Sequence, residues 1–290
     1  MVFSEFLSKG WSDHGKTPDQ VAESLQAGLA LANSPDDVIA LVNLTAHLYT
    51  EHIPRFIEGE RQLRDFAKND FVKGTPAEFA VARAIAAFRM CEGTLDPETD
   101  RMGLTPGDLA RALGLAASAL SGRDSVKSEK FLRLALAFVE PLELTSTDGI
   151  SRGLAIAANN SSATLMELDT QTEQQKNFML LAAEVARKYW ELAGTWLEVE
   201  RAECYWSARC LKAGNLVEAR KHAELCLSMT KENGSVPLEM FFATEALAKV
   251  ERAAGSNAFY ATLQDAVDWF EKISADDKTW AQASLDKLKK

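Results

Sequence analysis

The sequence predicts an all-α fold, an α-α superhelix of antiparallel helical hairpins. Apolar residues recur at helical spacing along most of the 290-residue chain, in segments of similar length. Short turns that contain Pro, Gly or Ser separate these segments. Alternating apolar and polar runs, which are typical of strands, are nearly absent. Together these observations favour about thirteen helices joined by loops of roughly two to seven residues.

Several expected helices begin with residues suited to a helix N-terminus. Asp36 and Asp37, like Asp276 and Asp277, place carboxylates where they cap free backbone amides. The lysines at the end of the chain suit a helix C-terminus, where carbonyl dipoles attract cations. Residues 1–16 are expected to form a polar leader. The expected helices run from Asp19 to Leu31, Asp36 to Tyr49, Phe56 to Lys68, Ala77 to Met90, Pro106 to Leu120, Ser125 to Glu140, Asp148 to Leu168, Thr172 to Leu192, Thr195 to Ala213, Leu216 to Lys231, Pro237 to Ala254, Ala258 to Ile273 and Asp276 to Lys289.

The composition limits the classes of partner. The formal net charge of −10 repels nucleic acids and anionic membranes on average, so we expect neither as a partner. No signal peptide and no run of ~18 apolar residues is evident, which predicts a cytoplasmic protein. The cysteines lack CxxC spacing and are expected to be reduced thiols, mostly in the core. Because no second group of Cys or His stands at ligand spacing, we expect no metal and no cofactor.

The clearest repeating unit lies between Cys204 and Leu227. A large apolar residue, Trp206, is followed by the small Ser207, and Gly214 marks the turn to the next helix. The second helix then supplies small residues where the two helices must approach closely, since larger side chains would force them apart. These small residues are Ala219, Ala223 and Cys226.

This unit resembles the tetratricopeptide repeat, a helical hairpin that stacks into a superhelix. The same step from a large to a small residue recurs elsewhere, with Ser161-Ser162 as its weakest match and turn glycines at Gly93 and Gly255. Successive small positions lie 41, 76, 45 and 41 residues apart, so the units are longer and less regular than the family's ~34 residues. The recurring small positions are Thr45, Ala86, Ser162, Ser207 and Ala248.

The resemblance implies one tetratricopeptide-like domain over residues 1–290. No linker rich in Pro, Gly or Ser divides the chain into two halves, which favours a single right-handed superhelix. The repeat pattern fails between residues 94 and 124, so we expect an irregular insert there. Residues 276–290 are expected to be a C-terminal capping helix.

The resemblance also locates the expected binding surface. In a stacked array the first helix of each hairpin lines the concave side, and residues one turn before the small position face the groove. Asn side chains there can hold a peptide backbone, and Arg or Lys can hold a carboxylate. The alternative is an ordinary solvated face with structural hydrogen bonds. The predicted ligand-binding residues are Asn43, Tyr49, Arg83, Asn159, Asn160, Arg201, Tyr205, Glu245 and Lys249.

Catalytic patterns are weaker. His47, Glu51 and His52 approach an inverted zinc motif, but one residue too many separates the first His from the Glu. On an ideal α-helix His52 also points about 100° away from Glu51. The remaining histidines, His14 and His222, have no nearby nucleophile in the sequence. We therefore expect no catalytic residues and no enzyme activity.

Three classes of function remain open. The first is a protein- or peptide-binding scaffold that uses the concave face, which the resemblance implies although fold alone does not define function. The second is a sensor that closes around a small molecule or signalling peptide. The third is an enzyme with a site in the irregular centre. An open polar groove would favour the first class, a closed apolar cavity the second, and clustered carboxylates or histidines the third.

Overall fold

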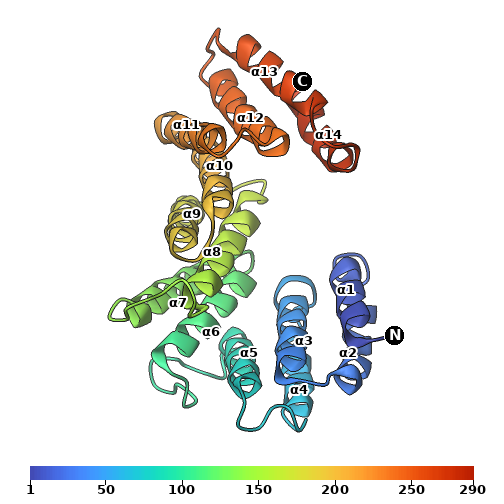
Figure 1. Cartoon of the computed structure of the whole chain (residues 1–290). Helices are drawn as coiled ribbons and strands as arrows, with labels where there is room; N and C mark the ends of the chain where they lie inside the picture. Colours follow the sequence, from blue (N-terminus) through green and yellow to red (C-terminus); the bar gives the residue numbers. More distant parts are fainter. The chain divides into compact units, whose positions relative to one another are not determined.

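The computed structural model describes residues 1–279 and 281–290 and confirms the all-α fold of helical hairpins. The described residues form helices and turns and no strand (Figure 1). The chain divides into two compact units, Met1–Leu144 and Thr145–Lys290. The boundary falls in a loop whose Pro141 and Gly149 are too few to mark a linker by composition. One continuous domain over residues 1–290 stays a prediction.

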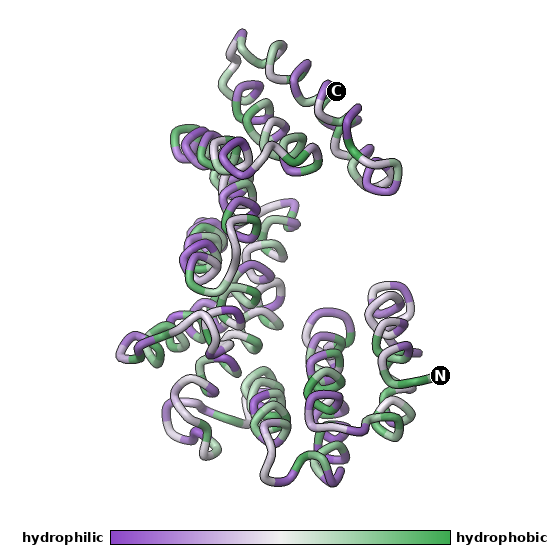
Figure 2. The backbone as a smooth tube through the Cα atoms, viewed as in Figure 1, coloured by the Kyte–Doolittle hydropathy of each residue, from purple (hydrophilic) through white to green (hydrophobic). Residues whose placement is uncertain are grey.

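Unit 1 is built from hairpins in which successive helices pack side by side. Helix α1 packs on α2 and α3, α3 packs on α5, and α6 packs on both α5 and α7. The helices are α1 (Phe3–Asp13), α2 (Pro18–Leu31), α3 (Pro35–His47), the π-helix η1 (Leu48–His52), α4 (Phe56–Phe66), α5 (Pro76–Glu92), α6 (Pro106–Leu120) and α7 (Ser125–Val139). In Figure 2 many helices carry both hydrophobic and hydrophilic residues, as expected where one face packs on a neighbour.

The expectation of a polar leader over residues 1–16 is wrong. Residues 3–13 form α1, whose Phe3, Phe6 and Gly10 are buried on the side that faces its neighbours. The polar residues between them made the segment look unstructured in the sequence. These three buried residues stabilise α1 only when it packs against α2 and α3.

The segment 94–124, expected to break the repeat, contains the expected helix α6 as a central element of unit 1. Eleven of its residues are buried, most of them Ala or Leu. The Ser128 hydroxyl of α7 donates a hydrogen bond of 2.6 Å to the Ala117 carbonyl of α6. Helices α6 and α7 form a tight hairpin like those of unit 2, so the irregular insert over residues 94–124 stays a prediction.

Unit 2 contains three hairpins and a last helix. Helix α10 packs against both α8 and α12, and α12 packs against α14, so the first helices of the hairpins follow one another in a row. No helix among the described residues has the length and apolar character needed to cross a membrane. The helices are α8 (Ile150–Met166), α9 (Glu173–Ala193), α10 (Trp196–Lys212), α11 (Leu216–Glu232), α12 (Pro237–Ala253), α13 (Phe259–Glu271) and α14 (Ala275–Lys289).

The recurring small residues mark the points of closest helix approach. Thr45, Ala86, Ser162, Ser207 and Ala248 are all at most 1% exposed. The two serines also make hydrogen bonds across their hairpins. Ser162 donates to the backbone carbonyl of the following helix α9, at 3.0 Å, and Ser207 donates to that of α11, at 2.7 Å. The small residue thus satisfies its own hydroxyl while letting the two backbones meet.

The turn between α10 and α11 has the backbone geometry that the sequence predicts. Gly214 has φ of +82°, a left-handed conformation that glycine adopts without steric cost. Directly across the hairpin, Ala219 is fully buried and its carbonyl accepts the hydrogen bond from Ser207. Ser207 and Ala219 therefore face each other across the hairpin.

Replacing Ala219 with Leu is expected to destabilise unit 2 by ~1–3 kcal/mol, because three extra carbon atoms must enter a closed helix contact. Denaturant unfolding of the full chain measures the change. The control is Ala253→Leu, at an exposed position at the end of α12, where the same substitution should cost far less. Equal stability of the Ala219→Leu chain and the unmodified chain would contradict the tight packing of this hairpin.

Candidate functional site

In unit 1 the predicted groove residues are divided between surface and interior. Asn43 is exposed, as expected. Tyr49 is only 1% exposed, and its hydroxyl donates to the Glu58 carboxylate at 3.1 Å. Arg83 is half-buried and forms a 2.7 Å ion pair with Asp108 of α6. Tyr49 therefore belongs to the core instead of a surface, and the Arg83 guanidinium already has a carboxylate.

In unit 2 two of the predicted charged residues are also paired. Arg201 reaches the Glu239 carboxylate of α12 at 2.5 Å. Glu245 is 4% exposed, and Lys249 lies one turn further along α12 at 2.7 Å. These pairs hold neighbouring helices or turns together, and the buried carboxylates need the cations as partners. Glu245 is thus a buried residue and not an open groove side chain.

Three predicted residues of unit 2 remain accessible. Asn159 and Asn160 of α8 are partly exposed, and neither amide forms a hydrogen bond with the described residues. Tyr205 of α10 is 46% exposed, which is unusual for a large aromatic side chain. Their polar groups and the Tyr205 ring are free to contact another molecule.

The sequence did not single out Arg209, which is the most unusual cation of unit 2. Arg209 is 6% exposed, and no carboxylate of the described residues forms an ion pair with it. Its Nε donates to the Ser162 hydroxyl at 3.1 Å, and one terminal nitrogen donates to the Tyr205 carbonyl at 3.1 Å. Burial lowers the pKa of Arg209 below its ordinary value. A buried guanidinium without a counter-charge is costly, and two neutral acceptors satisfy only part of its five N–H groups.

Several buried charges of unit 2 have an oppositely charged partner, unlike Arg209. Glu203 accepts from Arg187 at 2.7 Å and lies 2.6 Å from Nδ1 of His222. Burial opposes ionisation of Glu203, but these two hydrogen bonds and charges lower its pKa overall. The His222 ring in turn stacks on Trp206 at 3.9 Å between ring centroids. Neighbouring side chains therefore balance the charge of Glu203, whereas the fully buried Glu200 forms no ion pair with the described residues, and burial raises its pKa.

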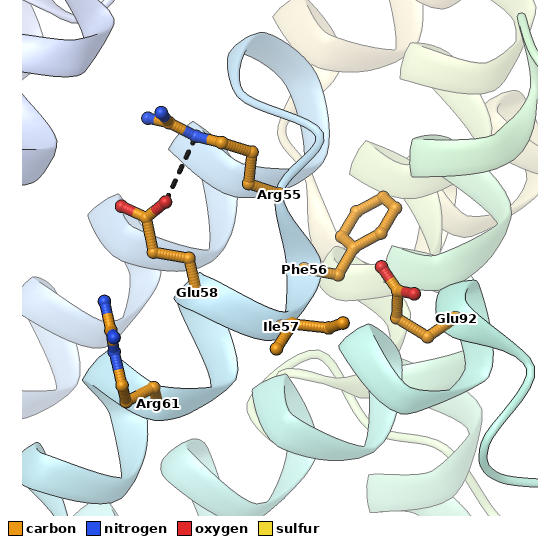
Figure 3. Close-up of a pocket in the computed structure, with 6 residues that line it drawn as sticks. All are labelled: Arg55, Phe56, Ile57, Glu58, Arg61 and Glu92. Atoms are coloured by element: carbon orange, nitrogen blue, oxygen red, sulfur yellow. Dashed lines mark ion pairs between the residues drawn. The ribbon is translucent and has the colours of Figure 1, made fainter.

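A second feature is an open hollow of about 420 Å³ on unit 1 (Figure 3). Arg55 and Glu58 on its rim pair with each other at 3.3 Å, and Arg55 also reaches Asp19 at 2.5 Å. Ile57 beside them is 73% exposed. Charges that pair with each other do not converge on a reacting group, so this hollow has no catalytic constellation. Its lining consists of Arg55, Phe56, Ile57, Glu58, Arg61 and Glu92.

The third feature is a cluster of three histidines in unit 1. His14, His47 and His52 have ring centroids 4.9 to 5.1 Å apart. The Nε2 atoms of His47 and His52 are 3.3 Å apart, and one nitrogen of each ring lies within 4.8 Å of the others. Trp11 lies against the rings of His14 and His47. The cluster therefore joins the end of α1 to the end of α3 and to η1.

A local change of helix type brings two of these histidines together. On a continuous α-helix, His47 and His52 would point about 140° apart, since five residues turn the chain by about 500°. Here the chain forms the π-helix η1, in which the Ile53 amide donates to the Leu48 carbonyl at 2.7 Å. A π-helix pairs residues five apart and is often found at functional sites. Neither the π-helix nor the packing of the segment that carries His14 is evident from the sequence, so the cluster was not predicted.

Glu51, the acidic member of the motif considered from sequence, does not join the histidines. Its carboxylate accepts a hydrogen bond of 2.6 Å from the Ser118 hydroxyl of α6. Burial and the neighbouring rings of His14 and His52 lower the pKa of His47 to about 4. Burial and His14 lower the pKa of His52 as well. Near neutral pH these two imidazoles are uncharged and keep a free nitrogen lone pair.

The fold places this chain in the class of all-α proteins made of stacked helical hairpins. No protein-family model matches the chain, and no curated protein matches its sequence. Its function is therefore inferred from side-chain geometry: the unpaired Arg209 in unit 2 and the histidine cluster in unit 1.

The lowered pKa of His47 predicts a pH dependence of unit 1 stability. Between pH 6.5 and about 4 the unfolded chain binds a proton at His47 that the folded chain does not bind. The free energy of unfolding should therefore fall as the pH falls through this range. A His47→Gln variant has no imidazole to titrate at this position. Any loss of stability relative to the unmodified chain should therefore become smaller as the pH falls. Denaturant unfolding at several pH values, with a chelator present, measures both chains; parallel pH profiles would contradict the effect.

Proposed function

We propose that this protein binds a partner protein in the cytosol and is not an enzyme, in line with its resemblance to tetratricopeptide repeats. The proposed binding surface consists of the exposed side chains of α8 and α10 around Arg209. The proposed ligand is an extended peptide segment that presents a carboxylate. The single observation that carries this proposal is the buried Arg209 guanidinium without an acidic partner.

A carboxylate would complete the interactions of Arg209. The Nε and one terminal nitrogen already bind Ser162 and the Tyr205 carbonyl, which holds the planar guanidinium in a fixed orientation. A carboxylate can accept two parallel N–H bonds from such a group and supplies the missing negative charge. Pre-ordering of the side chain lowers the entropy lost on binding.

The neighbouring side chains suit a peptide more than an isolated ion. The Tyr205 ring lies 5.0 Å from the Arg209 guanidinium, and the residue is 46% exposed, which suits contact with an apolar side chain. Asn159 precedes Ser162 by one helical turn on α8, so it lies on the face that Arg209 contacts. Its free amide has both a donor and an acceptor, which match one peptide unit. The chain as a whole carries a net charge of −10. A cation without a nearby counter-charge can therefore select an acidic ligand at this position.

The test measures binding of the full chain to an array of acidic peptides and to matched peptides in which carboxylates are replaced by amides. We expect the acidic peptides to bind and the amide forms to lose most of their affinity. Replacing Arg209 with Met should weaken the retained peptides by about thirtyfold, which corresponds to ~2 kcal/mol. Arg209→Lys should recover only part of the loss, because an ammonium lacks the planar fork.

Two controls separate binding from folding. Lys188→Gln removes one positive charge from an exposed position on α9 and should leave peptide binding unchanged. The stability of the Arg209→Met chain should stay equal or rise, since removal of an unpaired buried charge is seldom costly. If Arg209→Met unfolds unit 2, or if acid and amide peptides bind alike, Arg209 has a structural role and the proposal is wrong.

A further inference from the structure

We propose that His14, His47 and His52 form a binding site for a divalent transition-metal ion, with Zn²⁺ as the expected ion. The site lies within unit 1 and is independent of the peptide surface proposed for unit 2. Three imidazoles from three different helical segments converge here, although the chain contains only four histidines in total.

The spacing of the ring nitrogens matches tetrahedral coordination. Two nitrogens bound to Zn²⁺ at about 2.0–2.1 Å in tetrahedral geometry lie about 3.3 Å apart. The Nε2 atoms of His47 and His52 are 3.3 Å apart. The third ring offers a nitrogen within 4.8 Å of the other two, so binding of a metal ion by all three would draw this ring closer. Imidazole is a preferred ligand of zinc, and three such ligands leave one position for water or a further group.

A surrounding interaction orients one of the ligands. Nδ1 of His14 lies 2.5 Å from the Trp11 carbonyl, to which its N–H donates. This bond places the proton on Nδ1 and leaves Nε2 free to bind a metal, the arrangement found in most metal-bound histidines. The Trp11 ring covers one side of the rings of His14 and His47 and is itself 38% exposed. The cluster is therefore held in place but remains open to solvent.

Hydrogen bonding alone explains the cluster less well. Two neutral imidazoles with facing Nε2 atoms share at most one hydrogen bond, and a third ring nearby adds no carboxylate to balance a second proton. The adjacent carboxylate of Glu51 is turned to Ser118. The π-helix that brings His47 and His52 together also breaks the regular hydrogen bonding of α3, a cost that a bound metal would offset.

Metal binding would join the ends of α1 and α3 through η1. In the chain without metal, α1 is held to α2 and α3 by few apolar residues. An ion bound only by the folded state stabilises that state in proportion to its concentration and affinity. Zinc should therefore raise the melting temperature of unit 1.

The experiment titrates Zn²⁺ into the full chain after removal of metals by a chelator and reduction of the thiols. Calorimetry measures affinity and stoichiometry, and thermal unfolding measures stabilisation. We expect one equivalent of zinc to bind and to raise the melting temperature. His14→Gln, His47→Gln and His52→Gln should each weaken zinc binding at least tenfold, because each removes one of three ligands.

His222→Gln is the matched control, since His222 is the fourth histidine and lies in unit 2. It should retain the stoichiometry and affinity of the unmodified chain for zinc. Circular dichroism of each variant without metal shows whether it folds. If His47→Gln does not fold, zinc binding by the more peripheral His14→Gln and His52→Gln variants tests the site. Absence of zinc binding, or equal binding by all folded variants, overturns the site. Zinc binding that survives in the three variants and disappears after thiol alkylation assigns the metal to the cysteines and also overturns it.

Discussion

The close approach of paired helices is the constraint on which the rest of this structure depends. Small residues at the contact allow it, and several of them also satisfy their hydroxyl groups across the hairpin. Ser207 binds the carbonyl of α11, Ser162 that of α9, and Ser128 that of α6. Because these bonds fix the distance and rotation of each pair, they also fix which side chains of neighbouring hairpins meet. Arg209 reaches Ser162 only because both hairpins are packed this tightly.

In unit 2, some buried charged side chains have an oppositely charged partner, and Arg209 does not. Glu203 and Glu239 are buried, and each has at least one cationic partner. Removing such a partner would leave a buried charge without compensation, so these pairs restrict how the interior can change. Arg209 is the opposite case, because its charge is buried and its contacts are to neutral oxygens. The proposed recognition of a carboxylate follows from this imbalance and not from the fold itself.

The histidine cluster arises from local backbone geometry. A regular α3 would separate His47 from His52, whereas η1 brings their Nε2 atoms to 3.3 Å. The third ring comes from the residue that follows α1, so the cluster exists only when α1 packs on α3. The peptide surface proposed for unit 2 and the metal site proposed for unit 1 use different residues and different chemistry, and each is tested by substitutions that leave the other intact.

The sequence by itself determined the all-α class, most helices and the recurring small positions, because helical periodicity and turn glycines are local properties. It also placed Asn159, Asn160 and Tyr205 at accessible positions. Only the tertiary structure decided that Tyr49 and Glu245 are buried, that Arg83 and Arg201 are paired, and that Arg209 is not. The histidine cluster likewise depends on tertiary packing and a π-helix. Partners in these contacts lie up to 47 residues apart, and no local pattern specifies which side chains meet over such separations.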